Sequence, residues 1–336
     1  MKNQTRLLFN KYASHIAAIN GVPDATKQFV VEPTVEQKIE KRVQEQSDFL
    51  QKINVVPVDE VTGKKLGLGT TGPIASRTDT TVNERATSDI HDLTEDDYIC
   101  KKTDFDSHIK YDTVDMWAKF PEFQALMRDK VIEQIARDRL MIGFNGTSSA
   151  VETNFGANPL LQDVNIGWLQ HMRTKAAARV LSGTKVGTDA GNDYSNIDAA
   201  VFDAIGGMLD PWHRNGTDLV VICGSNLLHD KYLSLVGSSD APTERGALQT
   251  LMSNKQLASR PTMTVPFFPE DAVMVTPLSN LSIYWQEGSR RRTITDNAKR
   301  DRIEDYQSVN EAYVVEDLGA CCVLEGILTW DGVAWS

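Results

Sequence analysis

Few residues in this sequence have the types and spacing that chemistry needs, and the clearest group is a possible metal-binding triplet. Asp104, Asp106 and His108 alternate along the chain, so in a strand their side chains would share one face and could hold a divalent cation. A polar strand face turned to solvent accounts for the same alternation without a metal. The other histidines are scattered singly, and we expect no metal site.

A glycine-rich stretch, GLGTTG at 67–72, is a second candidate, because closely spaced glycines can turn backbone N–H groups toward a phosphate. It lacks the Lys-Ser/Thr ending of a P-loop and does not open a helix. The sequence contains no nucleophile elbow, zinc-protease motif or kinase set. We therefore expect no catalytic, cofactor-binding or metal-binding residue, and not an enzyme.

The segment 140–170 offers a third kind of site, an apolar one. It carries two turn signals, at 145–146 and 158–159, yet it is rich in large apolar residues. Such residues either line a small-molecule pocket, as in a carbohydrate or nucleotide enzyme, or pack an irregular segment onto something else, including another copy of the chain. The candidates for packing or interface contacts are Trp117, Phe144, Phe155 and Trp168.

Composition and charge argue against a protein whose main task is to grip nucleic acid. The 336 residues are 41% hydrophobic, which is normal for a globular protein, and carry a net charge of -11. Phosphate binding depends on clustered Lys and Arg, and the basic cluster here is Arg290-Arg291-Arg292. We interpret this run as a solvated or subunit-bridging strand end.

The cysteines and the hydropathy pattern fit a protein kept in a cytoplasm. Cys100, Cys223, Cys321 and Cys322 show no C-x-x-C spacing, and we expect buried thiols. The sequence has no run of 18 apolar residues and no secretory signal at its N-terminus, so we expect no membrane partner.

Two amphipathic helices are predicted within the first 50 residues. Leu7, Leu8, Tyr12 and Ile16 recur at three- and four-residue steps, and a second apolar stripe follows Pro33. Neither helix has an evident partner nearby in the sequence. We therefore expect an extended arm.

The next segment reads as a protruding hairpin followed by a long helix. Valines at 55–58, a turn at 62–64 and a return strand through 66–68 predict a hairpin, and the β-type residues of 98–117 would close the base of this excursion. Apolar residues at four-residue steps then predict a helix over 122–142.

The second half mixes helices with short strands. Helices are predicted over 165–181, 197–209 and 225–236, and strands over 219–224, 262–266, 272–277, 281–286, 290–295 and parts of 302–327. Several strands follow one another without intervening helices, which indicates an α+β fold with antiparallel pairing. An arm, a protruding hairpin and an irregular apolar segment all need partners, and so favour an obligate assembly.

Several stretches resemble the major capsid proteins of P2-like tailed phages. They are TRLLFNKY at 5–12, INGVP at 19–23, INVVPVDE at 53–60, DMWAKFP at 115–121, NPLLQDVNIGWL at 158–169, LVVICG at 219–224, LSIY at 281–284 and YVVED at 313–317. They occur in order from about residue 3 to 325.

The resemblance implies the HK97-like fold of tailed-phage capsid proteins. Its parts would be an N-terminal arm (1–52), an extended β-hairpin loop (53–112), a peripheral domain with a long spine helix (113–200 and 290–327), and an axial domain (201–289). A C-terminal tail (328–336) has no recognised counterpart.

The resemblance also implies a function. The chain would assemble into pentamers and hexamers of an icosahedral shell around double-stranded DNA, without reading its sequence, in the cytoplasm of a host bacterium. Partners would be a scaffolding protein with protease activity and a portal protein. Removal of an N-terminal piece near Val31 and Glu32 is expected during maturation, with the match at 29–33 and Pro33 starting a new helix. An encapsulin-like compartment around a cargo enzyme is the alternative.

Overall fold

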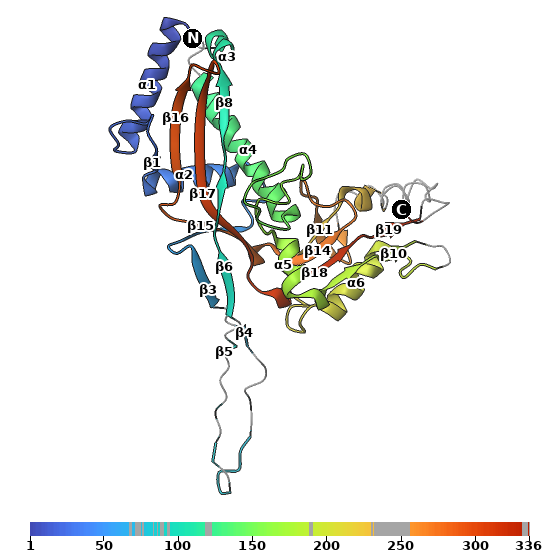
Figure 1. The fold of residues 1–336 in the computed structure, drawn as a ribbon. Coiled ribbons are helices and arrows are strands. Elements are labelled where there is room, and N and C mark those ends of the chain that lie inside the picture. The colour runs from blue at the N-terminus through green and yellow to red at the C-terminus, as the bar shows by residue number, and fades with distance from the viewer. Residues whose placement is uncertain are drawn as a thin grey trace.

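The computed structural model describes residues 1–66, 95–117, 123–187, 191–229 and 256–330, with shorter pieces at 69–70, 75, 77–82, 84–85, 87, 91–92, 231 and 335. Two sheet-based bodies meet near the middle of the molecule, and a narrow hairpin projects from their junction (Figure 1). The glycine-rich stretch at 67–72 lies mostly outside the described residues.

The first body is a seven-stranded sheet built around β17 (Arg302–Val315). Its main path runs β1 (Phe29–Val30), β16 (Arg291–Asn297), β17, β15 (Leu281–Gln286), β2 (Asn54–Val58). Two further strands, β7 (Lys101–Asp104) and β8 (Ser107–Lys110), also pair antiparallel with β17. A single 14-residue strand therefore pairs directly with four strands, β7, β8, β15 and β16.

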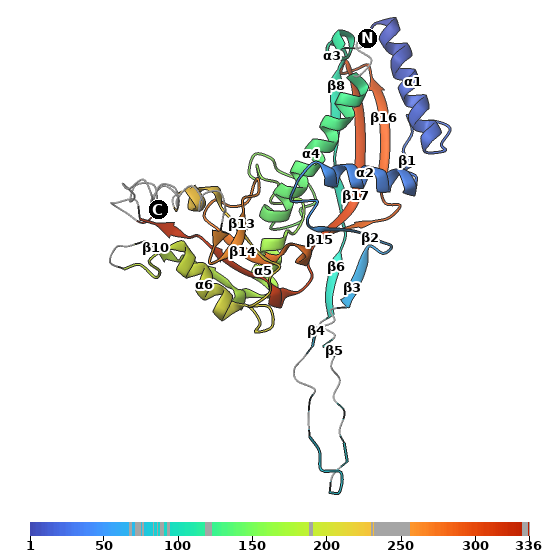
Figure 2. The ribbon, with the colours of Figure 1, turned by 180° about the vertical axis from the view of Figure 1, so that it is seen from behind.

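Helices lie against one face of this sheet and beside its β16 edge (Figures 1 and 2). These are α1 (Asn3–Ile19), α2 (Pro33–Glu45), the short α3 (Tyr111–Trp117) and the long α4 (Phe123–Asn145). The helix predicted over 122–142 is confirmed as α4, which runs three residues further because Gly143 stays helical.

The second body is a six-stranded sheet in the order β12 (Gln256–Leu257), β13 (Arg260–Met263), β11 (Leu219–Cys223), β14 (Val273–Pro277), β18 (Cys322–Glu325), β9 (Val180–Ser182). Alternate residues of β14 enter different cores: Val273 and Val275 pack with α6 (Ile197–Met208), whereas Met274 packs toward Trp168. Both faces are covered, which explains why these strands read as continuous apolar runs.

The hairpin differs from its prediction. The turn expected at 62–64 is wrong, because these residues lie inside β3 (Thr62–Leu66), which pairs antiparallel with β6 (Glu95–Ile99). Strand β2 instead pairs in parallel with β15. The pair β4 (Gly69–Thr70) and β5 (His91–Asp92) lies further from the body, in the part that projects beyond both sheets (Figure 1).

Three other expectations are corrected. The arm helices do have partners in their own chain: Phe9 and Ile16 of α1 pack with Phe29 and Ile294, and β1 pairs with β16. Residues 111–117 form helix α3 instead of a strand. The helix predicted over 165–181 is only α5 (Trp168–Lys175), followed by a 3₁₀ turn and then by β9.

The chain ends beside the second sheet. Strand β19 (Leu328–Thr329) pairs in parallel with β10 (Lys185–Val186), and the rings of Trp330 and Trp335 lie 5.3 Å apart. Among the helices that the structure describes, none combines the length and the apolar run that crossing a bilayer requires.

Candidate assembly surfaces and the buried charge cluster

Trp168 lies at the centre of the main core, where α4 and α5 meet the first sheet. Its side chain is 0% exposed, and its indole N–H donates to the Ser282 carbonyl at 3.1 Å. The rings of Phe144, Tyr313 and Phe49 surround it at centroid distances of 5.1, 5.5 and 5.9 Å. Two of the predicted packing residues, Phe144 and Trp168, are thus internal, and they do not line a pocket.

This packing depends on a glycine. The backbone of Gly143 lies so close to the Trp168 ring that an added Cβ would overlap it. Close approach of α4 to α5 therefore lets the indole fill the space between the helix and the sheet. Phe144 and Trp168 therefore belong to the core, whereas Asn165 and Ile166 of the same segment 140–170 line the pocket described below.

A cluster of buried charges joins α2, α4 and the first sheet. Arg139 of α4 donates to Glu40 of α2 at 2.7 and 3.1 Å and to Glu311 of β17 at 3.0 Å. Arg290 also donates to Glu40 and lies 3.9 Å from Glu36. All five side chains are almost fully buried.

The cluster contains three carboxyl groups and two guanidinium groups, so one carboxyl lacks a balancing charge. Burial alone would raise the pKa of Glu40, but Arg139 and Arg290 outweigh it and hold that pKa below its usual range. Burial raises the pKa of Glu36, and the Gly288 N–H and Arg290 offset only part of that shift. Glu36 Oε1 and Arg290 Nε and Nη1 have no hydrogen-bond partner, so Glu36 is the poorly satisfied carboxyl of the cluster and Arg290 its poorly satisfied guanidinium.

The basic run at 290–292 is not the solvated strand end that its sequence indicates. Arg290 is inside the charge cluster, and Arg292 pairs with Asp305 at 2.7 Å and donates to the Tyr12 hydroxyl. Arg291 alone of the three is exposed. Arg290 and Arg292 therefore form ion pairs and hydrogen bonds within their own chain. The local sequence does not indicate these contacts, because Glu40 and Tyr12 lie far away in the sequence.

The candidate cleavage residues sit between β1 and α2 in a folded segment. Val31 is 2% exposed, and its N–H donates to the Arg290 carbonyl at 2.9 Å. The Glu32 side chain caps α2 by accepting from the Val35 N–H at 3.2 Å, with Pro33 as the first helical residue. A protease that needs an extended peptide could bind here only after this segment leaves the sheet.

The irregular segment between α4 and α5 is a loop braced from within. Asp163 Oδ2 accepts from the Asn154 N–H at 2.8 Å and from the Asn158 amide at 3.0 Å. The Asn154 side chain accepts in turn from the N–H groups of Gly156 and Ala157, at 3.1 and 3.2 Å. These bonds fix the backbone around one exposed position, Phe155. We call residues 146–164 the Asp163 loop.

The Asp163 loop separates its apolar side chains into two groups. Leu161, at the unusual backbone angle φ 59°, packs against the main core. Phe155 is 70% exposed and Val151 is fully exposed. Of the three predicted packing or interface residues whose side chains the structure describes, Phe155 is therefore the one found on the surface. Trp117 ends α3, and its side chain lies outside the described residues.

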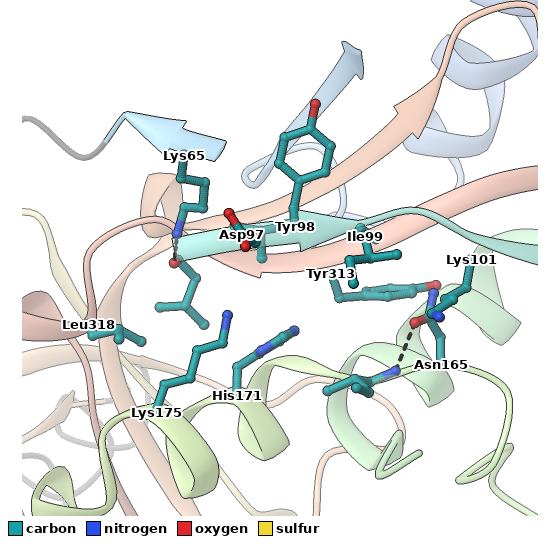
Figure 3. Close-up of a pocket in the computed structure, with 14 residues that line it drawn as sticks. Lys65, Asp97, Tyr98, Ile99, Lys101, Asn165, His171, Lys175, Tyr313 and Leu318 are labelled. Atoms are coloured by element: carbon teal, nitrogen blue, oxygen red, sulfur yellow. Dashed lines mark hydrogen bonds between the residues drawn. The ribbon is translucent and has the colours of Figure 1, made fainter. Parts of the chain in front are cut away.

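A pocket with a volume of about 210 Å³ lies between the hairpin strand β6, strand β17 and helix α5 (Figure 3). The Lys65 ammonium group donates to the carbonyls of Val315 and Glu316 at the hairpin side, and Lys175 and His171 extend from α5 on the opposite side (Figure 3). The other lining residues are Asp97, Tyr98, Ile99, Lys101, Asn165, Ile166, Ala312, Tyr313, Val314 and Leu318.

The acidic residues predicted as possible metal ligands make hydrogen bonds within the fold, and the cysteines are buried. Asp104 accepts from Lys102 and Asp106 accepts from the Gln307 N–H, both beside β17. In the described part of the chain, no three His, Cys, Asp or Glu side chains converge closely enough to hold a metal ion. All four cysteines are free and buried, as predicted, and burial raises the pKa of the Cys100 thiol to about 11 and that of Cys223 to about 12.

Comparison with known proteins gives these surfaces a context. The sequence profile of the family described as "Phage major capsid protein, P2 family" matches residues 8–327. This chain belongs to that family. It is 42% identical to the capsid protein of Escherichia phage P2, over 98% of this chain and 96% of the relative, and 40% identical to the major capsid protein of Serratia phage KSP20, over 97% of each.

Solved structures agree with the assignment to the P2 family. A chain from a satellite phage P4 procapsid, which includes a size-determination protein, is 41% identical, with a TM-score of 0.81 over 98% of this chain and 99% of that one. The capsid of an empty GTA particle and the cyanophage A-1(L) capsid share the fold alone, at 16% and 13% identity and TM-scores of 0.54 and 0.50.

The P2-family chain is therefore a major capsid protein of a phage virion, with the mixed helix-and-sheet fold of phage capsids. Its structural relatives are subunits of capsid shells, and the family is a structural one, not a class of enzymes. The encapsulin-like alternative is the weaker interpretation.

Proposed function

We propose that this chain assembles into pentamers and hexamers that close into an icosahedral shell around double-stranded DNA. The observation that carries the proposal is the near-complete match to a procapsid subunit, at a TM-score of 0.81. The hairpin adds physical support, because a projecting two-stranded excursion gains little from its own chain and needs contacts from a neighbour.

We assign the parts of the chain accordingly. Residues 1–52 are the arm, 53–112 the extended loop, 113–200 with 290–327 the peripheral domain with α4 as spine helix, 201–289 the axial domain, and 328–336 the tail. These boundaries agree with the two sheets only in outline, because β15 at 281–286 belongs to the first sheet, and β18 at 322–325 to the second.

Assembly would take place in the host bacterial cytoplasm with a scaffolding protein that is also a protease, and with a portal protein at one vertex. The chain would be cut near Val31 and Glu32. The acidic net charge of -11 suits a shell that holds DNA without adhering to it.

Electron microscopy of the chain expressed with and without its scaffolding protein tests the proposal. We expect regular closed shells when the scaffold is present. A dispersed monomer under both conditions would contradict the proposal. Intact-mass spectrometry of the shells tests trimming separately, since particles that contain only full-length chain would exclude a cut near residue 31.

A further inference from the structure

The Asp163 loop displays the Phe155 ring to solvent, where another molecule can contact it. The ring is 70% exposed, and Val151 on the same loop is fully exposed. The backbone beneath is already fixed by the hydrogen bonds of Asn154 and Asp163, so little conformational entropy remains to be lost on binding. A rigidly displayed aromatic side chain is typical of the residues that dominate protein interfaces.

The pocket between β6, β17 and α5 has the properties that a phenyl ring requires. Ile99, Ile166, Val314 and Leu318 give it apolar walls that would exclude water from a ring. The side chains of Lys65, Lys101 and Lys175 also line this space, with the Lys65 ammonium group held by the carbonyls of Val315 and Glu316, and cations near an aromatic face are attracted to it. Figure 3 shows Lys65 and Lys175 approaching the pocket from opposite elements.

We propose that Phe155 of one copy enters this pocket of a second copy. The inference rests on the proposed function, and it names one of the contacts by which the subunits assemble. A second copy is the occupant because the chain displays both the ring and the cavity, and its own ring is held out in solvent by the Asp163 loop. Such a contact joins two different surfaces, so each bound copy still offers either its phenyl group or its pocket to a further copy. The contacts can therefore continue until a closed oligomer or shell forms.

Engineered cysteines test the contact directly. Phe155→Cys and Ile99→Cys would be placed on separate chains, co-expressed with the scaffolding protein, and the purified particles oxidised. The native cysteines are buried thiols with raised pKa values, so they react slowly and give a low background. The matched control pairs Ile99→Cys with Phe202→Cys, whose phenyl ring is also 71% exposed but belongs to α6.

We expect disulfide-linked dimers on a non-reducing gel for the Phe155 and Ile99 pair, and far fewer for the control pair. Equal amounts of disulfide-linked dimer in the test and control pairs, or no dimer of the test pair in well-formed particles, would overturn the proposed contact. Either result would leave the proposed function intact. If the wild-type chain forms no shells with its scaffold, the proposed function itself fails.

A second set of variants covers the case in which Phe155→Cys prevents assembly. Phe155→Tyr keeps the aromatic ring, whereas Phe155→Leu keeps apolar bulk without it. We expect particles from the Tyr variant and a loss of most particles from the Leu variant. Particle yields that do not differ between the two variants would contradict a site that recognises a ring.

Discussion

Arg139 of α4 and Glu40 of α2 form a two-pronged ion pair, at 2.7 and 3.1 Å, with both side chains shielded from solvent. The pair links the arm helix to the long helix, and Glu311 ties both to β17. Replacing Arg139 by Met would leave the buried carboxylate of Glu311 without its cationic partner and Glu40 with Arg290 alone. We expect a loss of about 3–5 kcal/mol in the free energy of unfolding, measured by urea denaturation.

Arg137 supplies the matched control, because it lies on the same helix and pairs with Glu133 at the surface. Arg137→Met should change the free energy of unfolding by no more than about 1 kcal/mol. Similar losses for the two variants would show that burial does not govern these ion pairs.

Glu36 should make the fold less stable as the pH rises. Its pKa is raised chiefly by burial, so the folded chain binds this proton more tightly than the unfolded chain. The stability that results is present below the unfolded pKa of about 4.3 and is lost as the pH rises through the folded pKa. Glu36→Gln imitates the protonated form, and should therefore stabilise the chain at pH 8 but hardly at pH 4.

Urea midpoints at the two pH values measure this difference, and Glu45→Gln, on the exposed side of α2, is the control. Glu40 acts in the opposite sense, since its lowered pKa contributes stability that is lost as the pH falls. A Glu36→Gln variant that is less stable than the wild type at pH 8 would rule out a poorly satisfied carboxyl.

Two helical glycines should respond oppositely to the same substitution. An added Cβ at Gly143 would overlap the Trp168 ring, so Gly143→Ala should destabilise the fold by about 1–3 kcal/mol despite the better helix propensity of Ala. At Gly206 of α6 nothing lies within 4 Å of the added atom, so Gly206→Ala should stabilise by about 0.5–1 kcal/mol. Thermal unfolding of both variants checks the prediction, and a shift of the same sign would contradict it.

The cleavage that we propose near Val31 and Glu32 should depend on release of β1 from β16. Phe29 packs with Ile16 and Ile294, so Phe29→Ala should destabilise this docking by about 3–5 kcal/mol and speed cleavage at the site. Val30 is the neighbouring control, because its side chain points to solvent and Val30→Ala keeps the packing. Time courses of intact mass with the maturation protease measure both rates, and equal rates would mean that docking does not limit cleavage.

Local sequence patterns predicted the features that depend on neighbouring residues. The four-residue steps of Val131 and Ile135 mark α4. The predicted segments α6 and β11 are also present, because α6 has a helical period and β11 is a short continuous apolar run. The four buried cysteines follow from the same local reasoning.

The predictions that failed depend on partners far away in the sequence. Thr62 and Gly63 look like a turn, yet they pair with Ile99 and Tyr98 in β6. Arg290 looks like part of a solvated basic run, but its carboxylate partners come 250 residues earlier. Phe144 and Phe155 were both predicted to make packing or interface contacts, yet Phe144 of α4 is buried against Trp168, whereas Phe155 of the Asp163 loop is exposed.

The pairing of β17 also has a mechanical consequence. Strand β6 of the hairpin continues through Cys100 into β7, which pairs residue for residue with the segment 308–311 of β17, and β8 then pairs with 302–305. The hydrogen bonds of antiparallel strands run perpendicular to the strand axis. A pull on the hairpin along this line therefore loads many of these bonds together in shear, instead of peeling them one after another, and the hairpin can bear tension without unravelling the sheet that anchors it.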